Sequence, residues 1–434
     1  MNDQFLLSTA LTLLLPTGLI IIAAGASPPK RAIGVALMGL VSMAAAFVAY
    51  GLVGFGLQYG GLGLISGMAG AGELVREWSP LDTRMGPGWG LVGLDGFWVL
   101  GKEYGGELLA FFTFQAILAA TAALIPSLAL TGRVRRWVVV LTALLVGAVT
   151  YPLVGNWVWG GGWLANLGTN LQLGHGFVDF AGAGTIHLLA GLTALAGLLA
   201  FGVRHDEEAR QQPATIPPAH FPLFMLLGAL LTLVGWLGLV AGNWLSDPGT
   251  PEPLILLNLL LGASGGILLA ALYSGFVSGQ PDPLLVVRGL VGGLVAVSAG
   301  PAFVPLWAAL AIGAVSGLLV CLVTYVVERM AWLDDATGSV ATHATNGLWG
   351  LLTLGLLASG HYGVGWNGVG IAEYLGVAGQ GVTGYFVTRG VQPDFPQQFY
   401  AQLVGAVVII LFVFGLSWLC FRSLRRVGNL MGQR

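Results

Sequence analysis

Eleven long apolar runs are the feature that most constrains what this chain can fold into. Most approach the roughly 20 residues that an α-helix needs to cross a bilayer. Lipid offers no hydrogen-bond partners to backbone groups, so each run must satisfy its backbone internally, as a helix does. The sequence therefore predicts an all-α polytopic membrane protein with eleven transmembrane helices. The expected spans are 5–25, 33–56, 106–131, 137–153, 182–202, 221–243, 253–276, 286–299, 305–327, 339–361 and 399–421.

The composition agrees with a protein whose solvent is the bilayer. Hydrophobic residues make up 56% of the chain, charged residues only 8%, and the mean hydropathy is +0.84, whereas about one quarter of an ordinary soluble domain is charged. The net charge of −2 creates no basic field that would recruit nucleic acid. The 69 glycines let helix backbones approach closely in lipid, so we expect a tightly packed bundle.

The lysines and arginines predict the orientation, because basic residues concentrate in cytoplasmic loops. With an odd number of spans and the N-terminus outside, 13 of the 17 basic residues fall on the inner side. We expect a multi-pass protein of the plasma membrane, such as a bacterial inner membrane, with the C-terminus in the cytoplasm. The inner residues are Lys30, Arg31, Arg133, Arg135, Arg136, Arg204, Arg210, Arg288, Arg329, Arg422, Arg425, Arg426 and Arg434, and the outer ones are Arg76, Arg84, Lys102 and Arg389.

The long segments between the spans, at about 57–105, 154–181 and 362–398, all fall outside and are rich in glycine and aromatic residues. They predict a structured outer vestibule. No inner segment is long enough for a soluble domain, which excludes a fused kinase, cyclase or ATP-binding unit, and we expect neither enzymatic activity nor a cofactor. Cys321 and Cys420 lie in apolar runs, which favours packing over a disulfide or a thiolate metal site.

An internal repeat links residues 179–191 to residues 335–347. Each segment has an aspartate, a histidine eight positions later and a glycine four positions after that. The two copies begin spans that lie five apart, so they cross the membrane in opposite directions, as in an inverted-topology repeat with a site between the halves. The prediction is one membrane domain over 1–434, with repeat one at about 5–202, repeat two at about 221–361, and a final helix at about 399–421 outside the repeat.

The histidines of the repeat, His187 and His343, are the strongest candidates for function. An ionisable side chain within a span is costly and normally faces the bundle interior or a water-filled path. A neutral imidazole carries one donor and one acceptor, so a pair can share a proton and serve a small polar solute. The alternatives are that each ring only bonds a neighbouring helix, or that the pair binds a metal, for which no third ligand lies at a suitable spacing.

Residues near the ends of the spans are further candidates. Asp335, beside Asp334, is interpreted as a helix N-cap, whereas Asp179 is either a buried anchor or a charge that raises local cation affinity. Trp157 and Trp163 are expected to lie in the interfacial belt. Trp159, next to three glycines, could instead present its ring to a cation.

At these positions the chain resembles the ammonium transporter and Rhesus protein family. The resemblance implies a homotrimer with one pore per subunit, an outer ammonium site, a hydrophobic constriction, and the histidine pair below it. By this pattern Trp159 stacks on the recruited ion and Asp179 holds the site in shape. The matching motifs are Asp179 to His187, Asp334–Asp335 with His343, Val158 to Gly162, and Phe114–Gln115.

The chain departs from the family pattern at the constriction. Leu118 and Leu239 replace the usual pair of phenylalanines, and Asn243 aligns with the outer-site serine. Leucine keeps an apolar gate but removes a ring face worth about 0.5–2 kcal/mol to a cation. The segment from Arg422 to Arg434 is short beside the family's usual tail, so coupling to a PII-type regulatory protein stays open.

The sequence thus favours transport of ammonium or ammonia through a pore lined by His187 and His343. Because of the leucines at the gate, two other functions stay open. One is a channel for carbon dioxide or other inorganic carbon on the same scaffold, and the other is an ammonium-binding membrane sensor.

Overall fold

The computed structural model describes residues 3–202, 220–246, 252–330, 333–361 and 365–426. Arg204, Arg210, Arg434 and the tail beyond Arg426, which we predict to lie inside, fall outside these residues.

Within the described chain, nine helical segments are long and apolar enough to cross a membrane. They are α1 (Asp3–Thr12) with α2 (Leu14–Ala26); α3 (Pro29–Ala49) with η1 (Tyr50–Gly54), α4 (Phe55–Tyr59) and α5 (Leu62–Ile65); α7 (Gly106–Leu130); α8 (Arg136–Leu145) with η4 (Val146–Thr150) and α9 (Tyr151–Trp159); η5 (Ala183–Leu188) with α11 (Leu189–Phe201); α13 (Pro222–Ser246); α14 (Glu252–Ser278); α16 (Leu306–Arg329); and α18 (Gln397–Arg426).

The other two predicted spans also coincide with helices, which are shorter or less apolar. One is α15 (Pro283–Val297), and the other is η6 (Ser339–Ala344), continued by α17 (Thr345–Leu357). A helical, multi-pass membrane protein is therefore confirmed. The count of eleven spans and the inverted relation of the halves stay predictions.

Several helix ends differ from the expected positions. The second helical segment continues to Ile65 rather than residue 56, and the fourth to Trp159 rather than residue 153. Polar residues near these two ends stay helical because the two helices bond each other. Asn156 Nδ2 donates to the main-chain oxygen of Gln58 at 3.1 Å. The tenth helix ends at Leu357 rather than residue 361, since Ala358 has an extended backbone.

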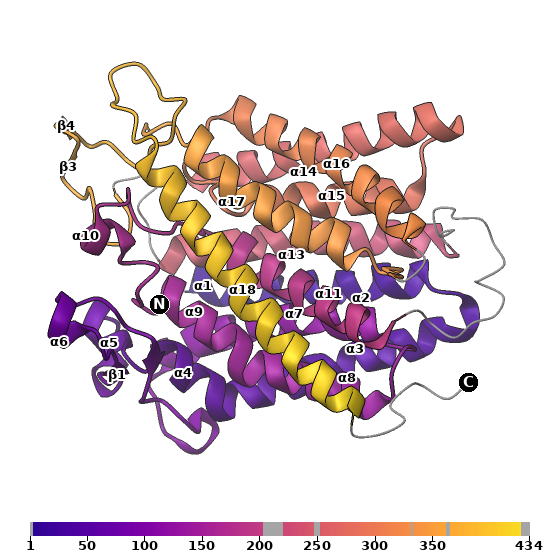
Figure 1. The fold of residues 1–434 in the computed structure, drawn as a ribbon, viewed down its shortest axis with the longest axis horizontal. Coiled ribbons are helices and arrows are strands. Elements are labelled where there is room, and N and C mark those ends of the chain that lie inside the picture. The colour runs from indigo at the N-terminus through magenta and orange to yellow at the C-terminus, as the bar shows by residue number, and fades with distance from the viewer. Residues whose placement is uncertain (1–2, 203–219, 247–251, 331–332, 362–364, 427–434) are drawn as a thin grey trace.

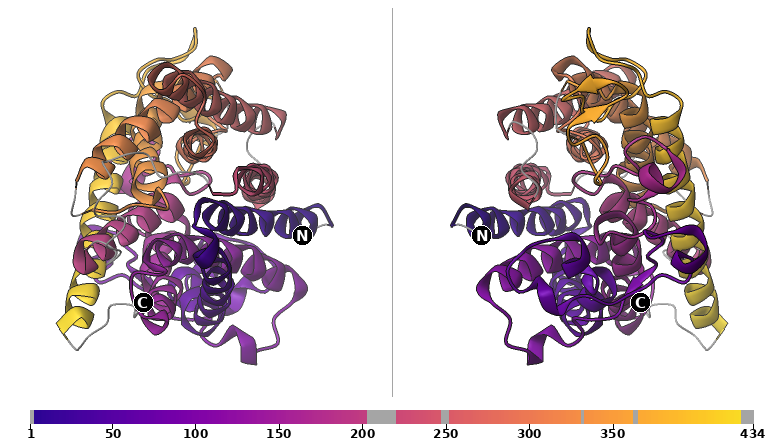
Figure 2. Two further views of the ribbon diagram at one scale, coloured as in Figure 1. Left: turned by 90° about the vertical axis from the view of Figure 1, so that its right-hand side faces the viewer. Right: turned by 90° about the vertical axis from the view of Figure 1, so that its left-hand side faces the viewer.

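The helices form one elongated bundle whose two halves lie side by side (Figure 1). Helices of the second half, α14 to α17, lie along the upper side of that view, and α3, α7 and α8 of the first half lie along the lower side. Helix α18 crosses both halves diagonally and packs on α11 and α17. The end-on views of Figure 2 show the same division, with α18 along one flank.

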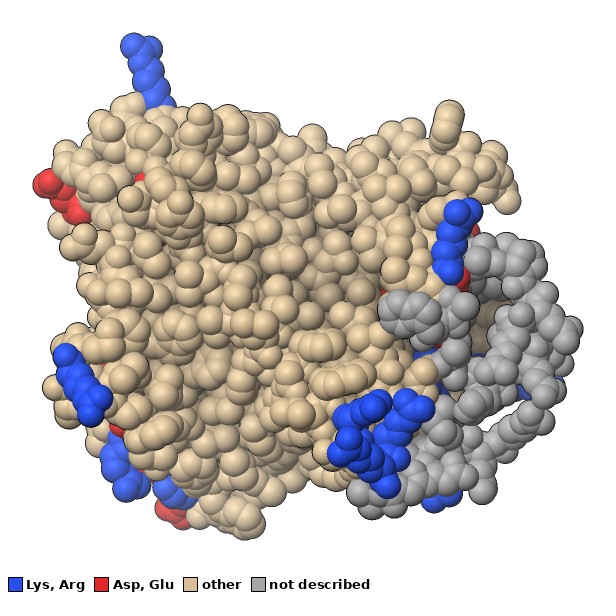
Figure 3. Space-filling view, viewed as in Figure 1, with Lys and Arg blue, Asp and Glu red and all other residues tan. Residues whose placement is uncertain are grey.

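Charged residues gather at the two ends of the molecule. Figure 3 shows a broad band free of lysine, arginine, aspartate and glutamate between them on the face in view. Side chains in that band can therefore contact hydrocarbon without desolvating charges.

Glycines let several helix pairs touch backbone to backbone. A Cβ atom on Gly313 of α16 would collide with the carbonyl of Gly262 in α14, and one on Gly317 with the carbonyl of Gly266. Such contacts replace the hydrophobic drive that is missing between helices in lipid. The expectation of a tightly packed bundle is confirmed for these helices.

The segments at one end of the bundle carry short ordered elements, drawn at the left of Figure 1. Arg76 and Asp95 form an ion pair of 2.6 Å between the strands there. The elements are η2 (Ala71–Glu73), α6 (Asp82–Met85), η3 (Val99–Gly101), α10 (Leu167–Leu171), β1 (Glu77–Trp78) antiparallel to β2 (Val92–Gly93), and β3 (Glu373–Tyr374) antiparallel to β4 (Val377–Ala378). The loops are structured, as predicted.

The buried His175 packs the segment at 154–181 against the segment at 362–398. The ring of His175 lies 4.2 Å from that of Tyr374 between centroids, and the Tyr374 hydroxyl donates to Asp394 at 2.8 Å. Burial lowers the pKa of His175 to about 4, against the opposing effect of Gln398. Burial raises the pKa of the Asp394 carboxyl, while its bond from Tyr374 lowers it.

We predict that Gly313→Ala lowers the unfolding midpoint of the detergent-solubilised protein. Its methyl group must displace the Gly262 backbone, and overpacking costs about 1–3 kcal/mol. Gly415→Ala in α18, which meets nothing within 4 Å, is the matched control and should leave the midpoint unchanged or raise it, because alanine favours helix over glycine. Equal midpoints for both variants would contradict the close contact.

We also predict that His175 makes the protein less stable in mild acid. Because the pKa of His175 is depressed, the unfolded state binds more protons than the folded state between pH 6.5 and about 4, so stability falls as the pH falls through this window. At pH 5 the penalty is about 2 kcal/mol. The raised pKa of Asp394 acts in the opposite direction but is present in every variant.

His175→Asn should therefore reduce the loss of unfolding midpoint between pH 7 and pH 5, measured by thermal denaturation in detergent. His220→Asn, at an exposed histidine, should keep the wild-type loss. An unchanged pH dependence in His175→Asn would mean that this ring titrates as freely in the folded protein as in the unfolded chain.

Candidate functional site

The two histidines of the repeat meet at the centre of the bundle. Nδ1 of His187 lies 3.2 Å from Nδ1 of His343, and the rings are nearly parallel, with 16° between their planes. Both residues lie in π-helical turns, η5 and η6, that begin α11 and α17. π-Helical turns often occur at functional sites because the extra residue redirects side chains. The sequence prediction that these side chains form a matched pair agrees with this geometry.

The aspartates of the repeat cap the two π-helical turns. Asp179 Oδ2 accepts hydrogen bonds from the N–H groups of Gly184 and Thr185 and from the Thr185 hydroxyl. Asp335 accepts from the N–H groups of residues 339, 340 and 341. The capping predicted for Asp335 is present, and Asp179 makes the corresponding anchor. Each carboxylate thereby fixes the turn that carries its histidine.

The glycines of the repeat allow the two turns to cross. A Cβ atom on Gly347 would meet the main chain of Ala183 and Leu188, and one on Gly191 would meet Ala344. Helix α11 accordingly packs on η6, and α17 packs on η5. The Asp–His–Gly spacing thus describes one structural unit, in which a cap, a polar side chain and a close crossing point follow in order.

Trp236 of α13 is a site residue that the sequence reasoning missed. Its indole is nearly parallel to the His187 ring, at 4.8 Å between centroids and 17° between planes. Its Nε1–H donates to the Ser298 hydroxyl at 2.7 Å. The signal that could have found it is a tryptophan in mid-span, three residues before the expected gate residue Leu239, far from the interfacial positions where membrane tryptophans gather.

The predicted gate residues Leu118 and Leu239 are both fully buried. They lie on α7 and α13 and belong to the same hydrophobic core as Phe114, whose ring packs on Phe5 at 5.5 Å between centroids. The apolar surroundings suit a constriction, but a gating role for these leucines stays a prediction.

The predicted outer-site residues are brought together only in part. Trp159 Nε1–H donates to the main-chain oxygen of Asp179 at 2.8 Å, which ties the end of α9 to the capped turn. Asn243 donates from Nδ2 to the oxygen of Leu239 in its own helix at 3.2 Å. Trp157 donates instead to the carbonyl of Leu91.

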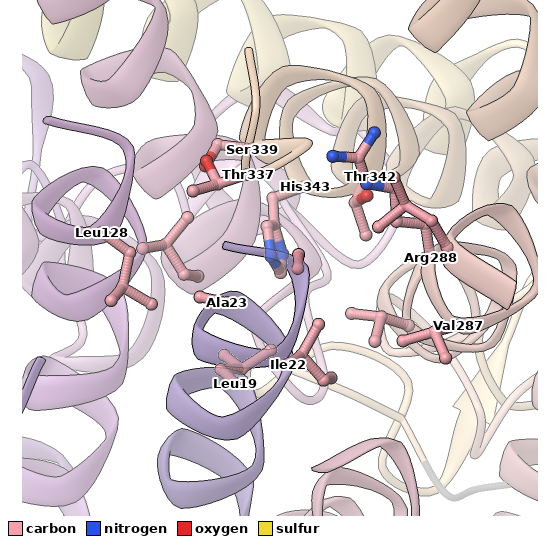
Figure 4. A pocket seen from close by; sticks show the side chains of 14 residues that line it. Leu19, Ile22, Ala23, Leu128, Val287, Arg288, Thr337, Ser339, Thr342 and His343 are labelled. Carbon is pink, nitrogen blue, oxygen red and sulfur yellow. The ribbon is translucent and has the colours of Figure 1, made fainter. Parts of the chain in front are cut away.

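A cavity of about 510 Å³, including its open mouth, reaches His343. Figure 4 shows His343 and Arg288 on its wall, with Leu19 and Ile22 of α2 below them. His187 does not line this cavity and is fully buried. Arg288 of α15 is the second residue that sequence reasoning missed, because it was counted only among the basic residues of the inner side.

The described residues contain no group of three or more histidine, cysteine or acidic side chains placed to hold a metal ion. At the centre of the bundle, the described residues place paired imidazoles among buried apolar side chains. Such a site can exchange a proton or hydrogen bond with a small solute.

Known proteins resemble this chain over most of its length. The model of the Ammonium Transporter Family matches residues 4–432. Ammonium transporter Amt2 of Archaeoglobus fulgidus is 30% identical over 422 residues, which cover 96% of this chain and 81% of that protein. The ammonium transporter of Bacillus subtilis is 27% identical over 349 residues, covering 80% and 77%.

Solved structures share the fold. A structure described as a sensor Amt protein superposes with a TM-score of 0.78 at 24% identity, covering 99% of this chain and 94% of that one. Mep2 of Candida albicans superposes with a TM-score of 0.75 at 21% identity, covering 98% and 84%. From its sequence match over nearly the whole chain, this protein belongs to the ammonium transporter family.

Proposed function

We propose that this protein transports ammonium across the membrane and that the path passes the pair formed by His187 and His343. The observation that carries the proposal is the 3.2 Å approach of the two Nδ1 atoms at the crossing of two aspartate-capped turns. Ammonium is proposed as the substrate because the relatives are named as ammonium transporters.

The histidine pair can bind and release a proton while at most one of the two rings is charged. A hydrogen bond between the two Nδ1 atoms needs one donor and one acceptor, so two neutral rings in opposite tautomers satisfy it. Nε2 of His187 has no hydrogen-bond partner within the described residues. This atom can accept a hydrogen bond or a proton from a solute.

The apolar wall favours passage of the uncharged form. Leu118, Leu239 and Trp236 are fully buried, and an ion that leaves water for such surroundings loses far more solvation energy than a neutral solute. Ammonium would therefore give up its proton before this stretch, and ammonia would cross it. The proton would pass to the histidine pair and leave it toward the inner side, so that each ammonia is accompanied by one unit of charge.

We assign the outer end of the path to Trp159, Asp179 and Asn243. The Trp159 ring, held by the main chain of Asp179, offers a face to a cation, and the Asp179 carboxylate adds negative charge beneath it. In the assembled protein we propose three subunits with one pore each, built from two inverted repeats, with the N-terminus outside and the C-terminus in the cytoplasm.

Transport is tested by the transient current of proteoliposomes on a solid-supported membrane after an ammonium concentration jump. We predict that His187→Ala and His343→Ala each reduce this current at least ten-fold, because each leaves its partner without the shared hydrogen bond. Gly415→Ala should keep the wild-type current. Unchanged flux in both histidine variants would remove the pair from the path.

The same preparation separates ammonium transport from the other functions. An ammonium current in the wild type supports the proposal. Its absence, together with fast carbon dioxide uptake by stopped flow, would assign the pore to inorganic carbon. Ammonium binding without flux in either assay would instead indicate a sensor.

The leucines at the expected gate predict weak recruitment of the cation. We expect Leu118→Phe to lower the ammonium concentration that gives half-maximal current by about two- to thirty-fold, because a restored ring face favours a cation by about 0.5–2 kcal/mol. Leu118→Ile controls for the change of shape, and thermal unfolding controls for overpacking. The same half-maximal concentration in all three proteins would separate Leu118 from the cation path.

A further inference from the structure

The two aspartate-capped turns differ in the charge that surrounds them. Within the described residues, Asp179 Oδ1 at the first turn has no hydrogen-bond partner, and the groups that stabilise the carboxylate charge are N–H and hydroxyl donors rather than a basic side chain. At the second turn, Arg288 stabilises the charge of Asp335. The repeat therefore ends in an uncompensated anion on one side and in a charge pair on the other.

Arg288 is held in place by the segment that leads into η6. Its side chain is buried, and Nη2–H donates to the main-chain oxygen of Ala336 at 2.8 Å. Its guanidinium lies against Gly338, where a Cβ atom would come within 2.7 Å of Cζ. Gly338 has φ +71°, so this backbone favours glycine and the close packing fixes the guanidinium beside the turn that carries His343.

Among the described residues, one charged side chain lines the cavity next to His343. Of its fourteen lining residues, Arg288 is the only one with a permanent charge, and the others are apolar or hydroxyl side chains and His343. The Asp335 carboxylate is directed to the N–H groups of η6 and does not line the cavity. The acidic groups that act on Arg288 are Asp335, Glu328 and Asp282, none of which lines the cavity.

We propose that Arg288 is a specificity-determining residue that excludes cations from the cavity below His343. A solute that leaves the histidine pair on this side enters a field set by a fixed guanidinium, so an uncharged or anionic species is favoured over a cation. The proposal rests on the proposed function only in naming ammonia as the uncharged solute. The sign of the field in the cavity does not depend on the substrate.

The alternative role for Arg288 is purely structural, through its bond to Ala336. Two substitutions separate charge from hydrogen bonding. Arg288→Lys keeps the charge, whereas Arg288→Gln keeps an N–H donor and removes the charge. Arg329→Gln, at an exposed arginine near the end of α16, removes a basic charge outside the cavity and is the matched control.

The field is measured by the reactivity of a cysteine placed in the cavity. Thr337, which lines it, is replaced by cysteine in the full chain after Cys321→Ala and Cys420→Ala. Cationic, neutral and anionic methanethiosulfonate reagents of similar size are then compared in detergent. The ratio of the anionic to the cationic modification rate reports the potential, and the neutral reagent reports access.

We expect this ratio to fall about ten-fold or more in Arg288→Gln and to stay near the wild-type value in Arg288→Lys and Arg329→Gln. An unchanged ratio in Arg288→Gln, or equal changes in the lysine and glutamine variants, would overturn the proposal. Loss of the ammonium current in the wild type would overturn the proposed function while leaving this ratio unaffected, so the two failures are distinguishable.

Discussion

The contact between His187 and His343 places two polar rings at the buried centre of the bundle. The rest of the site has to satisfy their polar groups without water. Buried donors and acceptors are costly unless they are paired. Each histidine lies in a turn whose free N–H groups are bonded by an aspartate, and the helix after each turn meets the other turn at a glycine. Without these caps the two π-helical turns would expose unpaired backbone at the centre of the bundle.

The same local design gives opposite electrostatic results at its two copies. Within the described residues, Asp179 is bonded by N–H and hydroxyl groups rather than by a basic side chain, and its main-chain oxygen accepts from Trp159, so in the proposed path this end would attract cations. Asp335 has Arg288 beside it, and Arg288 rather than the carboxylate faces the cavity. In the proposed path, the two copies of the Asp–His–Gly motif would thus differ in charge because of one side chain on α15, which lies outside both copies.

Much of this arrangement could be predicted from the sequence because it depends on local spacing. Apolar run length predicts helices, and an aspartate just before a helix predicts an N-cap, which is how Asp335 was interpreted. Trp236 and Arg288 were missed since their importance comes from contacts between distant segments: α13 against η5, and α15 against the segment before η6. Helix ends were misjudged for the same reason, as the bond between Asn156 and Gln58 keeps polar residues helical.

The leucines at the expected gate, Leu118 and Leu239, affect where along the proposed path a cation is attracted. An aromatic gate contributes attraction for a cation, whereas Leu118 and Leu239 contribute only an apolar barrier. In the proposed path, attraction is then left to Trp159 and Asp179 on one side, and repulsion of cations to Arg288 on the other. Between them, the histidine pair can take a proton from the solute. Selectivity for ammonium over other cations would follow from its ability to lose a proton, which sodium and potassium ions lack.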